Sequence, residues 1–365
     1  MRSNTAACFT NAGHPEIFES IIFLLSMLKK FIRRFLRREA ELAEPDESPL
    51  SPLTVLAVEP QPRPVEMIDV DNLFFPWVLG VEGAGAQDLN DAESRMLRAL
   101  KHEADRDDPA TADLVPRTPS VIPLLLRSLR DRNVSNSQLA AQVAQDAVLV
   151  AAVLKQVNSS YFRRSAPART IEEAIAVIGE NGLRMLIASV AFKPLFYAGL
   201  GHFTALGTPR VWALAEPFEV ACRYVEKHRH VDGFEVFLAG LLQHVAIIVA
   251  MRVMDRAGGA GQGELRSLAF HASFIHYTRR LARLIGMYWE FPDQVVAAIG
   301  HEAAPTNASL TEALYLADRT TKIRTLVNHG VLCEELADAC FEGADAAACY
   351  REMAAAEASR TKSGA

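Results

Sequence analysis

The chain has 365 residues, of which 50% are hydrophobic and 22% are charged. This composition excludes a disordered or collagen-like protein and leaves enough apolar side chains for a packed core. The net charge of −6 at pH 7 gives the whole chain no basic footprint, so we expect no nucleic-acid partner. The five cysteines include no CxxC pair, which favours free thiols in a reducing cytoplasm over a disulfide framework or a zinc ribbon.

Positive charge is concentrated at the N-terminus, where residues 1–38 contain seven basic and only two acidic side chains. From residue 27 onward, apolar pairs alternate with basic pairs every four residues, which on a helix produces one apolar and one basic stripe. The basic pairs are Lys29, Lys30, Arg33, Arg34, Arg37 and Arg38. Such an arm, over residues 1–43, suits peripheral contact with the inner membrane surface. A solvated arm, or a helix docked on the acidic body, is the alternative.

Two further features describe the chain before the folded body. The apolar run Ile17–Leu28 is interrupted and shorter than the roughly 20 apolar residues that span a bilayer. Residues 44–66 contain six prolines, which predict an extended linker. The folded part is therefore expected to begin near Met67.

The body shows helical periodicity almost throughout, and alternating β patterns are nearly absent. We predict an all-α fold. A cap at Asp91 would start one helix, and Thr170 and Gly179 would bound another. Residues 148–157 are nearly all apolar, which predicts a buried helix, and the chain after about Ala354 is expected to fray. The apolar, aromatic stretch 73–79 is expected to dock on the body. The predicted helices cover the stretch from Asp91 through Leu100, a helix opening at Pro119, one opening at Ser135, 148–157, 171–178, 182–197, 209–228, 233–256, 264–286, 291–302 and 309–328.

Several short motifs over residues 114–197 resemble the HDOD domain, a bacterial signalling relative of the HD-domain phosphohydrolases. The motifs are Leu114-Val115-Pro116-Arg117-Thr118-Pro119, Gln142-Val143-Ala144-Gln145-Asp146-Ala147-Val148-Leu149, Asn158-Ser159 before Tyr161, Thr170-Ile171-Glu172-Glu173-Ala174-Ile175, and Ile178-Gly179. Trp212, Gly240-Leu241-Leu242, Trp289-Glu290-Phe291-Pro292 and His301 continue the register. The resemblance implies a multi-helix HD-like bundle at 114–310, with helical extensions at 67–113 and 311–365.

The metal-ligand positions that the resemblance implies are altered. Catalytic HD proteins bind metals through an early histidine, a His-Asp pair and later histidines or an aspartate, and the metal activates a water for attack on phosphorus. Here the His-Asp pair is replaced by Gln243-His244, the late His-His position by His301-Glu302, and Leu214 stands where relatives often have histidine. We therefore expect no catalytic residue, no cofactor and no resident metal.

Two functions follow from this pattern. The first is a non-catalytic regulatory module that binds a signalling protein partner or a regulatory ligand, as the setting of HDOD relatives implies. Its candidate surfaces are the groove at Gln243, His244, His301 and Glu302, and the face at Asn158, Ser159 and Tyr161. The alternative for the latter residues, which the pattern favours, is that they cap the end of a buried helix.

The second function is a metal-dependent phosphohydrolase or phosphodiesterase acting on a nucleotide. It would need a rebuilt metal site, for which His244, His276, His301 and Glu302 are the candidate ligands. His301 and Glu302 are adjacent and point about 100° apart on a helix, so the remaining ligands would have to come from other helices.

Overall fold

The computed structural model describes residues 68–81, 88–106, 136–144, 147–158, 167–196, 201–258, 265–299 and 309–363. All of them belong to one compact unit, Met67–Ala365. The predicted arm, the linker, the helix at Pro119 and the site residues Ser159, Tyr161, His301 and Glu302 lie outside the described residues. Within the described ranges the chain forms helices and no β-strand, which confirms the all-α prediction.

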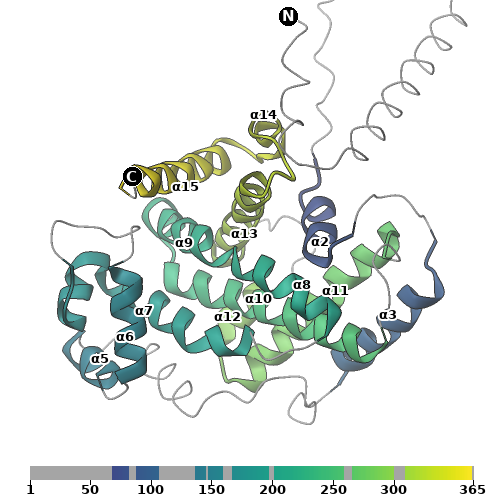
Figure 1. Cartoon of the computed structure of the whole chain (residues 1–365), viewed down its shortest axis with the longest axis horizontal. Helices are drawn as coiled ribbons and strands as arrows, with labels where there is room; N and C mark the ends of the chain where they lie inside the picture. Colours follow the sequence, from purple (N-terminus) through teal and green to yellow (C-terminus); the bar gives the residue numbers. More distant parts are fainter. Residues whose placement is uncertain are drawn as a thin grey trace, which may run out of the picture. The chain divides into compact units, whose positions relative to one another are not determined.

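Helix α10, Gly233–Arg256, is the core of the described fold (Figure 1). Its N-cap is Asp232, whose side chain accepts a hydrogen bond from the amide of Phe234 at 2.9 Å. It packs against α3 (Asp91–Ala104), α7 (Ile171–Phe196), α8 (His202–Trp212), α9 (Ala215–Arg229), α11 (Leu268–Tyr288), α12 (Asp293–Ala298) and α13 (Ser309–Asn328). The predicted bounds 233–256 match the observed helix.

Within the described part of the chain, two helices are long and apolar enough to cross a membrane by length and composition alone, α10 and the stretch Ile171–Lys193 of α7. The apolar window of α10 is 89% buried inside the protein. A helix that is apolar all round is expected at the centre of a helical core. Burial among other helices therefore accounts for the hydropathy of α10.

Gly240 lets α9 approach α10 closely. A Cβ at this position would overlap the ring of Phe218 on α9. The same ring packs edge-on against His244, one turn further along α10, with centroids 5.3 Å apart. The small residue in the Gly240-Leu241-Leu242 motif thus fixes the distance between two helices beside a candidate site residue.

The prediction of one helix over 209–228 is wrong, because α8 ends at Trp212 and α9 begins at Ala215. Pro217 has no amide proton and cannot continue the hydrogen-bond ladder across this point. The early start of α8 was also missed. Its first amides, those of Phe203 and Thr204, donate to Asp255 at 2.8 and 3.0 Å. Asp255 lies on α10, so this cap is invisible to local sequence patterns.

The helices α5 (Asn136–Val143) and α6 (Ala147–Val157) pack against α7. Thr170 caps α7 by accepting from the amide of Glu173 at 3.2 Å, as predicted. Gly179 interrupts α7 with φ 75° and ψ 175°, which confirms the predicted break, although the helix resumes at once. The prediction that residues 148–157 are buried is only partly right. Val153 and Val157 are buried, whereas other positions of α6, including Lys155, are exposed.

The N-terminal extension contributes α2 (Asp71–Leu79) and α3. Helix α2 buries its aromatic and aliphatic side chains against the body, as predicted for residues 73–79. The predicted cap Asp91 is wrong. The N-cap of α3 is Asn90, whose side chain accepts from the amide of Glu93 at 2.8 Å while Glu93 accepts from the amide of Asn90 at 2.9 Å. This reciprocal capping box leaves Asp91 as the first helical residue.

The C-terminal region forms α14 (Glu334–Ala337), a 3₁₀ turn at Asp338–Cys340 and α15 (Ala344–Ser363). The prediction of a frayed tail after about Ala354 is wrong. The carboxylate of Glu357 on α15 accepts from Arg324 at 2.7 Å and from Asn328 at 2.8 Å, both on α13. These contacts, together with the alanine-rich sequence, stabilise the last helix.

Candidate functional site

The residues at the altered His-Asp position line a small inner pocket of about 30 Å³. Gln243 and His244 lie side by side on α10 and face side chains from α2, α11 and α13 across it. The pocket has room for about one water molecule. Its lining includes Phe75, Gln243, His244, Arg279, Asp318 and Lys322.

His244 is held as a neutral imidazole. Its side chain is only 5% exposed and packs against the ring of Phe218. Burial, with a smaller contribution from the charge of Lys322, lowers the pKa of His244 to about 3. Its Nε2 atom and the Oε1 atom of Gln243 are buried without a hydrogen-bond partner among the described residues. Both residues that carry these unsatisfied atoms line the inner pocket.

A buried ammonium is the central charge of this region. Lys322 on α13 is 7% exposed, and its Nζ lies 2.7 Å from Asp71 Oδ1 and 2.7 Å from Asp318 Oδ2. It also lies over the rings of Phe74 and Phe75, 5.2 and 5.1 Å from their centroids. Burial lowers the pKa of Lys322, but attraction to the two carboxylates outweighs it and the pKa is raised. The ammonium is therefore charged and shared by two acids.

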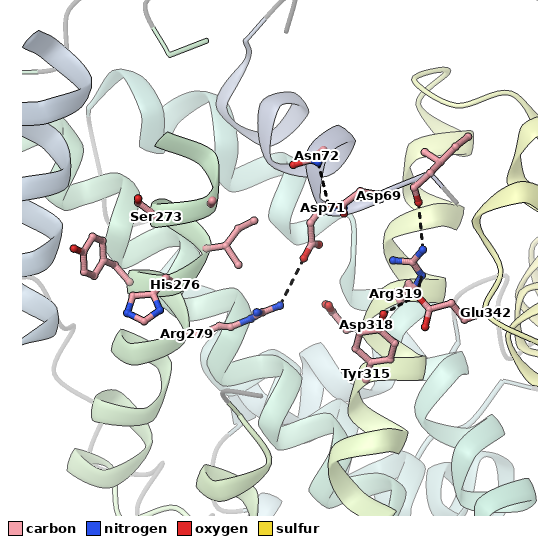
Figure 2. A pocket seen from close by; sticks show the side chains of 14 residues that line it. Asp69, Asp71, Asn72, Ser273, His276, Arg279, Tyr315, Asp318, Arg319 and Glu342 are labelled. Carbon is pink, nitrogen blue, oxygen red and sulfur yellow. Dashed lines mark hydrogen bonds and ion pairs between the residues drawn. The ribbon is translucent and has the colours of Figure 1, made fainter. Parts of the chain in front are cut away.

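Asp71 brings a carboxylate from α2 into contact with cations on two other helices. Its Oδ2 lies 3.6 Å from Arg279 of α11 (Figure 2). This contact adds to the bond with Lys322 of α13. Burial raises the pKa of Asp71, and the charges of Lys322, Arg279 and Arg319 lower it further than burial raises it. The net shift is downward, so Asp71 is an anion at neutral pH.

A larger outer pocket of about 700 Å³ opens beside Asp71 (Figure 2). It lies between α2, α11, α13 and Glu342, which precedes α15, and it shares Arg279 and Asp318 with the inner pocket. Arg319 donates to the carbonyls of Ile68 and Cys340 and pairs with Glu342 at 3.3 Å. Small-molecule sites commonly have volumes of about 300–1,000 Å³. The outer pocket is therefore large enough for a small ligand.

Tyr315 completes one wall of the outer pocket by donating its hydroxyl to Glu342 at 2.8 Å (Figure 2). Burial and this hydrogen bond raise the pKa of Tyr315 to about 12. The phenol is therefore a neutral donor over the physiological range. Its bond to Glu342 also holds the carboxylate that faces Arg319 in place.

The described residues do not fit a divalent metal. His244 offers one neutral nitrogen, but the acid of the inner pocket, Asp318, is already paired with Lys322. A metal bound by Asp318 would stand next to a buried ammonium and be repelled by it. Among the residues that the structure describes, no cluster of three or more His, Cys, Asp or Glu side chains could hold a metal ion.

The structure brings together only some of the predicted site residues. Gln243 and His244 line the inner pocket, and His276 is exposed on α11 at the outer pocket. Asn158 lies elsewhere, at the end of α6, where its amide donates to the carbonyl of Ala168 and accepts from the amide of Ala168, both at 2.7 Å. These two hydrogen bonds favour the alternative in which Asn158 caps the end of α6 and does not contact a partner.

Asp71, Asp318 and Lys322 were not predicted as site residues. Asp318 and Lys322 stand four apart in the predicted helix 309–328, a spacing that places opposite charges on one helix face. Asp71 lies 251 positions from Lys322, and no local pattern connects the two. Only the tertiary fold shows that they meet.

Comparison with known proteins agrees with this architecture. A structure of an HDOD domain protein of unknown function from Geobacter sulfurreducens is similar, with 19% identity over 74% of this chain and 97% of that chain and a TM-score of 0.52. A protein of Shewanella amazonensis, provisionally named a metal-dependent phosphohydrolase, matches with 19% identity over 73% of this chain and 99% of that chain and a TM-score of 0.50. At these identities the likeness shows the fold alone.

A sequence relative is also found, an uncharacterized protein of Treponema pallidum that is 35% identical over 78 residues. The match covers 21% of this chain and only 15% of that protein, so it says nothing about the activity of either. The family model of the HDOD domain matches residues 115–305, which is more than half of the chain. The chain therefore belongs to the HDOD domain family.

Proposed function

We propose that this chain is a regulatory HDOD module without catalytic activity, which recognises a ligand or a protein partner at the pockets beside α10. The observation that carries the proposal is the buried Lys322 ammonium between Asp71 and Asp318, next to the altered His-Asp position. A catalytic HD site needs its carboxylate for a metal ion. Here the carboxylate of the inner pocket is neutralised by a tethered cation.

The partner that we propose is a signalling protein, as the regulatory setting of HDOD relatives suggests. We further propose that the protein acts in the cytoplasm and that the basic arm, Lys29 to Arg38, brings it to the inner membrane surface. The acidic net charge of the chain argues against a nucleic-acid partner.

The second candidate is a metal-dependent phosphohydrolase or phosphodiesterase that acts on a nucleotide. The unpartnered Nε2 of His244 favours it, because a buried imidazole nitrogen can bind a metal. His301, Glu302 and His276 would be the other ligands of such a site. The charge of Lys322 is the argument against it.

The two functions are separated by an activity assay on the full chain. Hydrolysis of bis(p-nitrophenyl) phosphate would be measured with Mn²⁺, Fe²⁺, Ni²⁺ or Zn²⁺, for the wild type and for His244→Ala. The regulatory function predicts the same background rate in both proteins. Metal-dependent hydrolysis that disappears in His244→Ala would support the phosphohydrolase instead.

A further inference from the structure

Two neighbouring side chains of α10 each carry a buried polar atom that has no hydrogen-bond partner among the described residues. These atoms are Oε1 of Gln243 and Nε2 of His244, and both residues line the inner pocket. Leaving a buried polar atom without a hydrogen bond is costly, and most such atoms in native proteins are bonded to other protein atoms or to an ordered water molecule. The two atoms therefore indicate a bound partner in or beside this pocket.

Two further side chains of the inner pocket can form an additional hydrogen bond. Lys322 has three N–H donors, and its described bonds to Asp71 and Asp318, both at 2.7 Å, use two of them. Thr278 donates its hydroxyl to a carbonyl of its own helix at 2.6 Å, so its oxygen can still accept a hydrogen bond. The pocket thus offers a donor from α13, Lys322, and an acceptor from α10, Gln243.

The charges around the inner pocket favour a neutral occupant. The charged residues that line it are Arg279, Asp318 and Lys322. The carboxylate of Asp71 pairs with both cations, so this group of four side chains has no net charge. An added anion would be repelled by Asp318 and an added metal ion by Lys322. A neutral molecule meets neither repulsion.

The size of the inner pocket limits this occupant to a very small molecule. Its volume is about 30 Å³, whereas one water molecule requires about 10–15 Å³. Sites for organic ligands are larger, with volumes of about 300–1,000 Å³. A buried water also needs about two to four polar partners. Gln243, Lys322 and His244 supply that number.

We propose that the inner pocket is a binding site for an ordered water molecule, which accepts a hydrogen bond from Lys322 and donates one to Gln243, with His244 as its third partner. The water then stands at the altered His-Asp position. The inference deepens the proposed function and rests on it, because a metal ion bound at this position would exclude the arrangement.

This water is structural and not a nucleophile. The ammonium of Lys322 engages a lone pair of its oxygen, and the neutral amide of Gln243 cannot take its proton. Burial lowers the pKa of His244 to about 3, so this imidazole is a weak base at neutral pH. A water held in this way satisfies the buried polar atoms without supplying chemistry.

A high-resolution crystal structure of the full chain tests the site without any substitution. We expect an electron-density peak at hydrogen-bond distance, about 2.7–3.2 Å, from Gln243 Oε1 and from Lys322 Nζ. No peak in the pocket, or a peak that contacts neither atom, would overturn the inference alone. A peak with the anomalous scattering of a transition metal would overturn the proposed function as well, so the two failures are distinguishable.

Gln243→Met tests the site in solution, because the sign of its effect differs between a hydrated and a dry pocket. Loss of one hydrogen bond to the water should lower the thermal midpoint by about 2–4 °C. In a dry pocket the change would remove an unpartnered polar atom, so a midpoint equal to or above that of the wild type would overturn the inference.

Gln294→Met is the matched control for this variant. Gln294 lies on α12, is exposed, and donates to Glu235 at 2.9 Å on the surface. We expect its thermal midpoint to equal that of the wild type, because an exposed hydrogen bond is readily replaced by water. If Gln243→Met does not fold, the crystal structure of the wild type decides.

Discussion

Replacing Lys322 by methionine removes the ammonium while keeping a flexible apolar stem over Phe74 and Phe75. The change leaves Asp318 without its described partner and Asp71 with only the longer contact to Arg279. Breaking a buried ion pair by removing one member costs about 3–5 kcal/mol, because the remaining charge stays desolvated. We expect Lys322→Met to lower the free energy of unfolding by about this amount, a large part of the roughly 5–15 kcal/mol of an ordinary domain.

The effect has a definite pH dependence. In the wild type the pKa of Asp71 is lowered, so its stabilising contribution is present above the unfolded pKa of about 4 and is lost as the pH falls below it. In Lys322→Met the lowering by the ammonium is lost, so burial raises the pKa of Asp71 above its wild-type value. The penalty for burying this carboxylate is then largest at neutral pH and disappears on protonation. The stabilities of the two proteins should therefore converge between about pH 7 and about pH 4.5.

The assay is urea unfolding followed by circular dichroism at both pH values. Lys101→Met is the matched control, because Lys101 pairs with Asp105 at 2.8 Å but is 59% exposed. Exposed pairs contribute little, so this variant should unfold like the wild type. The reasoning is refuted if Lys322→Met costs no more than Lys101→Met at neutral pH, or if its deficit grows on acidification.

Three further predictions concern the surroundings of the site. The pKa of His244 is about 3 in the folded state and about 6.5 in the unfolded state, so the free energy of unfolding should fall by about 1.4 kcal/mol per pH unit as the pH drops below 6.5. His244→Leu should lack this slope in urea unfolding. Parallel pH profiles of the variant and the wild type would contradict the buried neutral imidazole. Gly240→Ala should destabilise by about 1–3 kcal/mol despite the better helix propensity of alanine, since its methyl group would overlap the Phe218 ring; a thermal midpoint equal to that of the wild type would show that α9 can move aside. Asn158→Ala should cost about 1–3 kcal/mol and speed amide exchange at Ala168, and a partner-binding defect at unchanged stability would instead restore the recognition role.

Most of the helices could be predicted because their information is local. Apolar spacing gave the bounds of α10, and Thr170 and Gly179 marked a start and a break that the structure confirms. The failures have tertiary causes. The start of α8 depends on Asp255, which lies on another helix, and the last helix is stabilised by Glu357 against α13.

The candidate site could be predicted only in part for the same reason. The altered His-Asp position pointed to Gln243 and His244, and both line the inner pocket. The cation that determines its chemistry, Lys322, is bound by an acid 251 residues away. A substitution pattern shows which ligands are missing, but it does not show what has taken their place.

The most direct test of the account is the metal content of the full chain, purified without a histidine tag, incubated with Mn²⁺, Fe²⁺, Ni²⁺ and Zn²⁺, desalted and analysed by elemental mass spectrometry. The tethered Lys322 ammonium predicts that no metal is retained in stoichiometric amount. One metal ion per chain, lost in His244→Ala, would contradict the account and would support the phosphohydrolase.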